Sequence, residues 1–342
     1  MDFPSRAGRY IQQATGYKAF VPAPLPPDPA IDYSGELQTL LSAADRDIGR
    51  LDALAALLPN PDLFVAMYVR HEAVLSSQIE GTRSTLEDVL AYEADAIGDA
   101  TPKDVAEVVN YVRAMNHGLR RLSELPLSLR LLREIHAELM HGVRGGNKSP
   151  GEFRSSQNWI GGAGSTLKDA AFVPPPPHEL MAALGQLERF LHEARASVPL
   201  LVRCALAHAQ FETIHPFLDG NGRIGRLLVP LYLVSHGILA KPSLYLSDFF
   251  ERHRASYYDA LMRVRIGNDM LHWVRFFLNG VLETATKGRQ VFQGILALRH
   301  DADESIATLG KRVPNARAAL AVLYRRPVIT AADLKAELKV ST

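Results

Sequence analysis

The sequence predicts an all-α fold interrupted by one β-hairpin. Apolar residues recur at intervals of three and four along most of the chain, which is the spacing of amphipathic helices. This pattern disappears over residues 151–177, where two short extended runs flank a Gly/Ser-rich segment and four prolines follow. With 47% hydrophobic residues and a net charge of +1, the composition is that of an ordinary globular enzyme without overall attraction to nucleic acid or anionic membranes.

The amino-terminal part is expected to open with an extended arm and to continue as helices. Residues 1–31 are rich in proline and predict a segment that runs over the surface. Apolar residues then recur at helical spacing over residues 37–54. Pro59 and Pro61 end this helix, and a second helix is expected over residues 62–79.

Capping signals predict where the following helices begin. Ser84 and Glu87 have the spacing of a capping box in front of a helix that runs through Leu90. Thr101 and Pro102 have the residue types of the next helix start. Further helices are expected over residues 127–141, 178–194, 198–213, 223–236, 247–265 and 269–286.

The chain is expected to divide into three parts: a helical region with the arm (residues 1–98), a core (99–286) and a C-terminal segment (287–342). Two short helices over residues 316–324 and 330–338 resemble the start of a winged helix-turn-helix that lacks its recognition helix and wing. Arginines make this segment locally basic: Arg312, Arg317, Arg325 and Arg326. A solvated helical face has the same pattern, and packing or dimerisation is favoured over DNA binding.

The cellular setting is read from cysteine usage and the N-terminus. Cys204 is the single cysteine and lies in an apolar helical run, so neither a disulfide framework nor a cysteine metal site is expected. The N-terminus has no apolar signal core, and no run approaches the roughly 20 apolar residues of a membrane span. We therefore expect a cytoplasmic protein without a membrane partner.

The segment 215–226, His-Pro-Phe-Leu-Asp-Gly-Asn-Gly-Arg-Ile-Gly-Arg, carries most of the functional information. Gly220 and Gly222 allow the backbone to approach a ligand closely, and the chain turns helical directly after them. The N-terminus of a helix favours phosphate through its free N–H groups and its dipole. Arg223 and Arg226 are three residues apart, hence on one helical face, and guanidinium groups suit phosphate oxygens. The segment is therefore predicted to bind a polyphosphate.

Two further residues of this segment have side chains suited to chemistry beside a phosphate. His215 can accept a proton near neutral pH, and Asp219 is an oxygen ligand of the kind that Mg²⁺ uses together with substrate phosphates. The glycines also satisfy the dinucleotide pattern GxGxxG, with Gly225 as the third. That pattern requires a preceding strand, whereas residues 202–214 have a helical pattern, so the dinucleotide-binding fold is excluded.

The whole segment resembles the signature HPFx[DE]GNGRxxR of the Fic family, whose members transfer AMP from ATP to protein hydroxyls. The resemblance implies a Fic-type helical bundle over about residues 20–285, with ATP and Mg²⁺ as ligands. It also implies a target protein with an accessible Ser, Thr or Tyr hydroxyl, and modification of the chain itself. A homodimer is a further candidate assembly, because family members often form dimers.

The resemblance also implies roles for individual residues. His215 is the expected general base and Asp219 the Mg²⁺ ligand. The expected nucleotide-binding residues are Gly220, Asn221, Gly222, Arg223, Arg226, Tyr257 and Tyr258. The two tyrosines lie in the region where the family contacts the base, but aromatic core packing explains at least one of them better.

The predicted hairpin at residues 151–177 occupies the place of the family's flap, which positions the target side chain. Its sequence, GEFR followed by QNWIGG, looks like the flap of many Fic proteins. The expected docking residues are Asn158, Trp159, Ile160, Gly161 and Gly162. An exposed strand edge there would pair with an extended segment of the target, although an ordinary surface hairpin has the same pattern.

An upstream segment resembles the family's inhibitory motif, [ST]xxxE[GN]. It begins at Ser76 and contains Glu80 followed by Gly81, which a capped helix end would explain equally well. The resemblance implies that the Glu80 carboxylate pairs with Arg226 and blocks its contact with the ATP γ-phosphate. The predicted function is therefore an autoinhibited protein adenylyltransferase.

Two other functions remain open at this stage. The same site could remove AMP from a modified protein or transfer another nucleotide. A DNA-binding regulator whose core only senses nucleotide is a third possibility, but it gives His215 no purpose.

Overall fold

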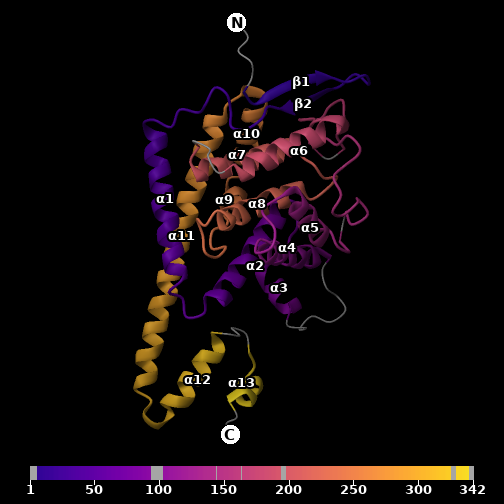
Figure 1. The fold of residues 1–342 in the computed structure, drawn as a ribbon. Helices are drawn as coiled ribbons and strands as arrows, with labels where there is room; N and C mark the ends of the chain where they lie inside the picture. The colour runs from indigo at the N-terminus through magenta and orange to yellow at the C-terminus, as the bar shows by residue number, and fades with distance from the viewer. Residues whose placement is uncertain are drawn as a thin grey trace.

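The fold was analysed in a computed structural model that describes residues 6–93, 103–143, 145–162, 164–193, 198–324 and 329–338 (Figure 1). In chain order its elements are β1 (Gly8–Gln12), β2 (Lys18–Pro22), α1 (Glu36–Ala55), α2 (Pro61–Ile79), α3 (Leu86–Glu93), α4 (Lys103–Arg121), α5 (Leu129–Leu139), α6 (Pro177–His192), α7 (Leu200–Ile214), α8 (Asn221–Ser235), α9 (Ser247–Arg252), α10 (Arg254–Gly267), α11 (Met270–Ala307), a 3-10 turn (Gly310–Arg312), α12 (Val313–Leu323) and α13 (Ala331–Leu338). The predicted all-α class is confirmed.

The bundle is built around α7, which packs against α6, α8, α10 and α11. Every residue of α7 from Leu201 to Ile214 is buried. A helix that is buried on all sides needs no polar face, which explains the weak amphipathic pattern of this stretch. Helix α8 follows after a short loop and is buried from Arg223 to Leu233. The loop between these two central helices is the signature segment.

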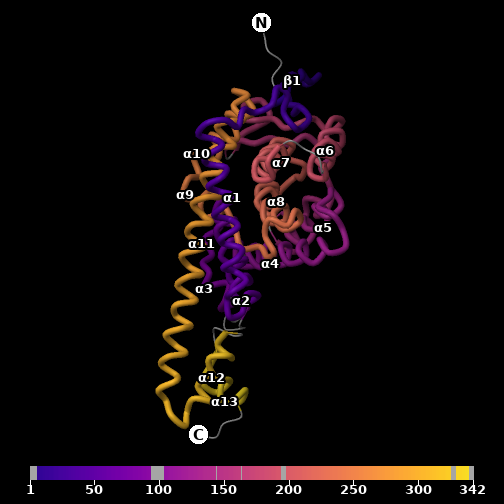
Figure 2. Tube along the Cα trace, turned by 60° about the vertical axis from the view of Figure 1, so that its left-hand side comes forward, coloured from indigo at the N-terminus to yellow at the C-terminus, as the bar shows by residue number. Residues whose placement is uncertain are grey.

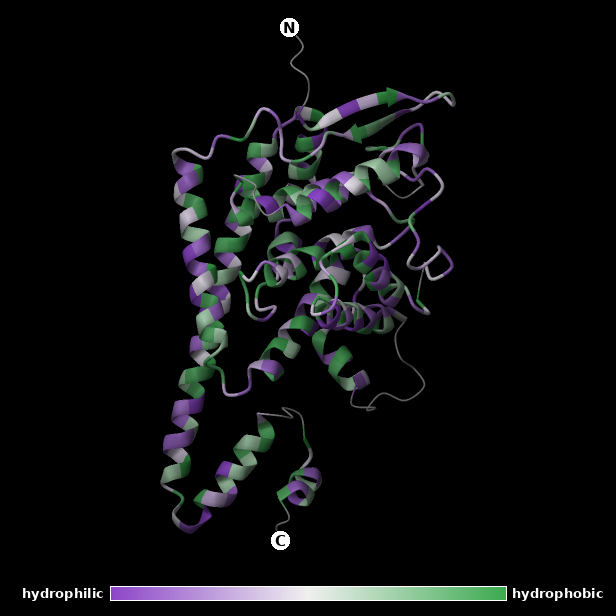
Figure 3. Cartoon of the chain, in the orientation of Figure 1, coloured by the Kyte–Doolittle hydropathy of each residue, from purple (hydrophilic) through white to green (hydrophobic). Residues whose placement is uncertain are grey.

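Helix α1 lies along α11, as the two views in Figures 1 and 2 agree. Helix α11 continues to Ala307, well beyond the predicted end at residue 286, because its apolar face continues through the buried Phe292. The helix thus runs through the boundary predicted between the core and the C-terminal segment. Figure 3 shows hydrophobic and hydrophilic residues alternating along this outer end.

The hairpin expectations need correction. The arm over residues 1–31 is not simply extended: β1 and β2 pair antiparallel, with Tyr10 opposite Phe20. The predicted flap hairpin at residues 151–177 has no regular strands among its described residues, and an isolated bridge joins Ile160 to Phe172. The four prolines that follow Val173 limit strand pairing, because proline lacks the backbone N–H that pairing requires.

The predicted capping box is shifted by one residue. The backbone N–H and hydroxyl of Thr85 donate to Asp88 Oδ2, and the Asp88 N–H donates back to Thr85 Oγ1. Ser84, the predicted cap, is buried. The predicted helix start at Thr101 and Pro102 lies outside the described residues.

The start of α2 connects the bundle to the C-terminal helices. Asn60 caps α2 by accepting from the Leu63 N–H at 3.2 Å, and its amide donates to the carbonyl of Tyr324 at 2.7 Å. Tyr324 directly follows α12. Residues 325–328 and 339–342, which include Arg325 and Arg326, lie outside the described part, so the partial winged helix remains a prediction. Among the described helices, none is both long and apolar enough to cross a membrane.

Candidate active site

The signature loop borders a cavity of about 590 Å³ that collects most of the predicted site residues. The predicted residues that line it are His215, Asp219, Gly220, Asn221, Gly222, Arg226, Tyr257, Tyr258, Glu80, Trp159, Ile160, Gly161 and Gly162. Four predicted residues lie outside this lining: Arg223, Ser76, Gly81 and Asn158. Helices α7, α8 and α10, the end of α2 and the flap thus converge on one pocket.

His215 directly follows α7 in a left-handed conformation with φ of 49°. A non-glycine residue in this region is uncommon and here turns the chain out of the helix. About a fifth of the side chain is exposed. Burial lowers the pKa of His215, and the positive charges of Arg265 and Arg154 lower it further, so the imidazole is neutral at physiological pH. A neutral imidazole can accept a proton.

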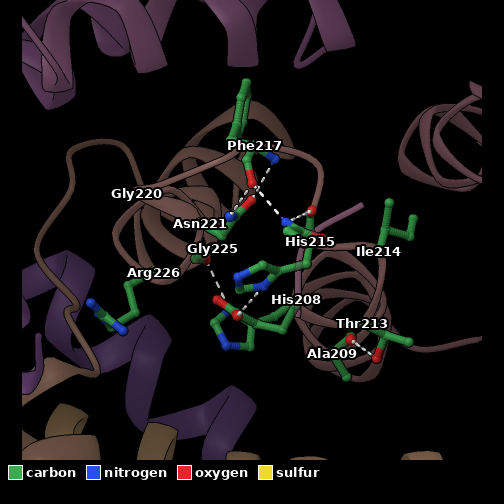
Figure 4. Close-up of polar contacts among 12 residues, drawn as sticks. His208, Ala209, Thr213, Ile214, His215, Phe217, Gly220, Asn221, Gly225 and Arg226 are labelled. Atoms are coloured by element: carbon green, nitrogen blue, oxygen red, sulfur yellow. Dashed lines mark hydrogen bonds and ion pairs between the residues drawn. The ribbon is translucent and has the colours of Figure 1, made fainter. Parts of the chain in front are cut away.

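Asn221 holds the loop in shape from the first turn of α8 (Figure 4). Its Oδ1 accepts from the Phe217 N–H and its Nδ2 donates to the Phe217 carbonyl, both at 2.8 Å. Phe217 is fully buried and anchors the loop in the core. Gly220, at the cap of α8, has φ of 76° and brings the following N–H groups to the cavity. The sequence analysis assigned Asn221 to nucleotide binding, whereas its side chain is used inside the loop.

The flap holds the loop from outside through two side chains. Arg154 is buried and donates from Nε to the His215 carbonyl at 3.0 Å. Asn158 donates from Nδ2 to the carbonyls of His215 and Phe217 at 3.1 and 2.9 Å. Trp159 is 40% exposed at the cavity. The sequence analysis did not identify Arg154 as a site residue, although it ends the quoted GEFR motif.

His136 on α5 is a second residue that sequence analysis missed. Its ring stacks on Phe217 with centroids 3.8 Å apart. Its Nδ1 accepts from the Gly151 N–H at 2.8 Å, so Nε2 carries the proton and donates to the Asp219 carbonyl at 3.1 Å. Burial lowers the pKa of His136 to about 4 and keeps it neutral. Nothing in the local sequence marks this long-range contact.

The inhibitory segment reaches the second signature arginine. Arg226 Nη2 lies 2.6 Å from Glu80 Oε1 and also donates to the Ser76 carbonyl, while Nε donates to the Ser76 hydroxyl at 2.7 Å. Burial raises the pKa of Glu80, but the charge and hydrogen bond of Arg226 outweigh this and lower it overall. Gly222 leaves room for this pair, because a β-carbon at its position would overlap Glu80 Oε1 unless that side chain shifted. Gly81 ends the segment with φ of 98°.

The first signature arginine has a different partner. Arg223 Nη1 lies 3.1 Å from Glu107 Oε2, and both side chains are almost completely buried. Arg223 Nη2 lies 3.8 Å from Asp219 Oδ1. The predicted pair of phosphate-binding arginines is therefore occupied by two carboxylates.

Asp219 is the candidate ligand for a divalent cation. Its Oδ1 accepts from the Gly220 N–H at 2.7 Å, and its Oδ2 lies 3.4 Å from the Lys148 ammonium. Among the described residues there is no group of three or more His, Cys, Asp or Glu side chains that could hold a metal. A single carboxylate still fits Mg²⁺, which takes one or two carboxylates and completes its shell with water and substrate phosphates.

The two tyrosines differ in environment. Tyr257 is buried and stacks on Phe250, and its hydroxyl lies 2.9 Å from His208 Nε2. His208 Nδ1 lies 2.8 Å from the Gly225 carbonyl and must carry the proton, so Tyr257 donates to Nε2. Tyr258 is 42% exposed at the cavity. Of the two, Tyr258 is the one accessible to a nucleotide.

Comparison with known proteins yields matches to one family. The model of the Fic/DOC family N-terminal region matches residues 38–120, and the model of the Fic/DOC family matches residues 126–233. Curated relatives called protein adenylyltransferase Fic, from Aedes aegypti and Culex quinquefasciatus, are 31% and 30% identical over 199 residues. The alignments cover 57% of this chain but only 35% of those proteins, so the chain matches about a third of their length.

Solved structures show the same architecture. A Fic family protein from Desulfovibrio desulfuricans G20 aligns with a TM-score of 0.64 and 22% identity, over 91% of this chain and 86% of that one. A fragment of Fic-1 from C. elegans aligns with a TM-score of 0.54 and 22% identity, over 77% and 76% of the two chains. At this identity the likeness establishes the fold.

Proposed function

The chain belongs to the Fic/DOC family, and from this premise we propose that it is a protein adenylyltransferase that is autoinhibited by Glu80. Its substrates are ATP and a protein with an accessible Ser, Thr or Tyr hydroxyl. The observation that carries the proposal is the meeting of a neutral His215, the glycine-rich start of α8 and the buried Arg226 at one cavity. The curated relatives with this activity support the same reaction.

In the proposed reaction His215 takes the proton from the target hydroxyl. The hydroxyl oxygen attacks the α-phosphorus of ATP, and the bond from this phosphorus to the bridging oxygen breaks, which releases pyrophosphate. Holding base, nucleophile and phosphate in one pocket supplies much of the acceleration, because the reactants need not meet by diffusion. The close hydrogen bonds to the His215 and Phe217 carbonyls keep the base in place.

The phosphates are proposed to lie against the first turn of α8. Gly220, Asn221 and Gly222 at the start of α8 line the cavity, and the first N–H groups of a helix favour phosphate. Arg226 would bind the γ-phosphate once Glu80 leaves, and Asp219 would hold Mg²⁺, which neutralises charge on the phosphates. Lys148 would then exchange its contact with Asp219 for solvent or phosphate.

The flap is proposed to receive the target. Among its described residues the flap has a bridge between Ile160 and Phe172 but no regular strand ladder. An extended target segment would hydrogen-bond along this edge and bring its hydroxyl to His215. The exposed Trp159 offers an apolar contact beside the edge.

Replacing His215 tests the reaction. The His215→Ala variant should lose transfer of label from α-³²P-ATP to protein, while it still binds nucleotide, because the phosphate contacts remain. His178→Ala, an exposed histidine on α6, is the matched control and should behave as the parent protein. Both changes belong in a Glu80→Gly background so that the parent activity is measurable. Undiminished transfer by His215→Ala would contradict the base assignment. Release of AMP from a modified protein without any transfer would favour the alternative in which the site hydrolyses AMP from a modified protein.

A further inference from the structure

Glu212 is a buried carboxyl beside the proposed base that the mechanism above does not use. It lies on α7, one turn before His215, and the residue is only 6% exposed. Its Oε2 lies 4.0 Å from His215 Nδ1. Its Oε1 and the His215 Nδ1 are both buried, and neither forms a hydrogen bond within the described parts of the chain. One oxygen of the Glu212 carboxyl is thus unpaired, and the other lies near the unpaired Nδ1 of His215.

Space for this carboxyl is provided by α8. Gly225 packs against Glu212, and a β-carbon at this position would overlap Glu212 Oε1. The family signature leaves the position of Gly225 unspecified, yet the structure gives a physical reason for glycine there. The absence of a side chain at 225 allows the Glu212 carboxyl to lie between the two central helices.

The charged and titratable groups around Glu212 come from four elements. Arg226 lies on α8, Arg265, Tyr257 and Tyr258 on α10, Glu80 after α2, and His215 at the end of α7. Burial raises the pKa of Glu212 to about 7, Arg226 and Arg265 lower it, and the negative charge of Glu80 raises it. No side-chain donor within the described residues satisfies the carboxyl.

A purely structural role does not explain this arrangement. A buried carboxyl destabilises a fold unless it is paired and hydrogen-bonded, so a packing position would be served better by an apolar residue. Buried polar groups without partners occur where a catalytic task requires them. Hydrogen bonds between catalytic groups are often long in the free protein and tighten when substrate binds, so 4.0 Å is within reach of a small side-chain movement.

We propose that Glu212 is a positioning residue that accepts a hydrogen bond from the Nδ1–H of His215. This bond fixes the tautomer in which Nε2 has a free lone pair, and Nε2 then accepts the proton of the target hydroxyl. The imidazolium so formed carries protons on both nitrogens and is stabilised by the Glu212 carboxylate. The inference rests on the proposed transferase function, since it specifies the base of that reaction.

One rival acceptor is close by. The backbone carbonyl of Glu212 also lies near the His215 ring, although it already accepts from Arg265 Nη2 at 2.9 Å. If the carbonyl alone held the ring, the same tautomer would form and the carboxyl would be dispensable. Experiments must therefore separate the carboxyl from the carbonyl.

The tautomer can be measured without activity. In ¹⁵N-histidine NMR spectra of the full chain near pH 7, we expect His215 in the Nδ1–H form, assigned by comparison with His215→Ala. In Glu212→Met, which keeps the length of the side chain and removes its acceptor oxygens, the Nε2–H form should become populated. An Nε2–H form in the parent protein would overturn the proposal, and so would an unchanged Nδ1–H form in the variant.

Kinetics supply the second readout, in the Glu80→Gly background. We expect Glu212→Gln to lower kcat for transfer by roughly 100-fold or more, with KM for ATP changed less than about twofold, because the base is affected and the phosphate site is not. Glu138→Gln, at an exposed position on α5, is the matched control and should retain parent activity. Parent-like kcat in Glu212→Gln would overturn the proposal, whereas no transfer in the Glu80→Gly parent itself would refute the proposed function instead.

Discussion

The two signature arginines lie on the same helix, three residues apart, yet their ion pairs are built differently. Arg223 pairs with Glu107 on α4, and the two side chains are 3% and 4% exposed. Arg226 is equally buried, but the side chain of its partner Glu80 is 33% exposed. Glu107 belongs to a helix of the bundle, whereas Glu80 directly follows α2 at the edge of the cavity.

From this difference in burial we expect the ion pair of Arg223 with Glu107 to be permanent and that of Arg226 with Glu80 to be exchangeable. Glu107 cannot leave Arg223 without burying an unpaired charge, so this pair is expected to persist when nucleotide binds. Glu80 can swing into solvent, and a phosphate can take its place on Arg226 at little cost in buried charge. The proposed autoinhibition by Glu80 would thus be a competition between a carboxylate and a phosphate for one guanidinium.

Breaking the permanent pair should have the largest effect. Glu107→Ala leaves the buried Arg223 with only the more distant carboxylate of Asp219, so we expect the free energy of unfolding to fall by about 3–5 kcal/mol. Urea denaturation followed by circular dichroism measures this change, with Glu138→Ala on the surface of α5 as the control. A loss below about 1 kcal/mol would mean that the two ion pairs are equivalent.

Breaking the exchangeable pair should raise activity instead. Glu80→Gly removes a charge-assisted hydrogen bond worth about 1.5–3 kcal/mol, so AMP transfer or automodification should rise roughly 10- to 100-fold. The free energy of unfolding should change much less than in Glu107→Ala, because Arg226 keeps its bonds to Ser76 and gains access to solvent. Labelling with α-³²P-ATP measures the gain, and unchanged or lower transfer in purified protein would count against the inhibitory role.

The smallest effect is expected at Ser76, which holds Arg226 in the orientation that meets Glu80. Ser76→Ala deletes one hydrogen bond, worth about 0.5–1.5 kcal/mol, and should raise transfer by a few-fold at most. Ser77→Ala is a matched control, because the neighbouring hydroxyl is also buried but does not contact Arg226. Equal effects of the two changes would show that general loosening of α2, rather than the arginine contact, controls activity.

Sequence reasoning found the parts of the site that lie in contiguous motifs. The loop from His215 to Arg226 was recognised from its contiguous pattern, and the pairing of Glu80 with Arg226 was implied by the family resemblance. The structure brings His215, Glu80 and Arg226 together at one cavity. His136 and Arg154 were missed, because their contacts join residues some 60 to 80 positions apart and leave no periodic trace.

In the fold, too, local sequence patterns do not reveal features that depend on distant contacts. Helical periodicity predicted the helices of the bundle, but the outer end of α11 has few buried residues and a weaker pattern, so its length was underestimated. The segment that forms the β1–β2 hairpin is predicted from sequence as an extended arm, because nearby prolines obscure the alternation of apolar and polar residues along its strands. Its position depends on a distant partner: the Phe20 N–H donates to the Val173 carbonyl at 2.9 Å.

The hydrogen bond between Asn60 and Tyr324 has a practical consequence for work with shortened versions of the chain. Helix α2, which Glu80 directly follows, is hydrogen-bonded at its N-terminus to Tyr324, the residue after α12. A version that ends after α11 would lose this hydrogen bond, and its basal activity would then differ although every residue of the pocket is retained. Assays that compare trimmed and full-length proteins therefore need Glu80→Gly versions of both, so that a loosened helix is not mistaken for a change in the chemistry.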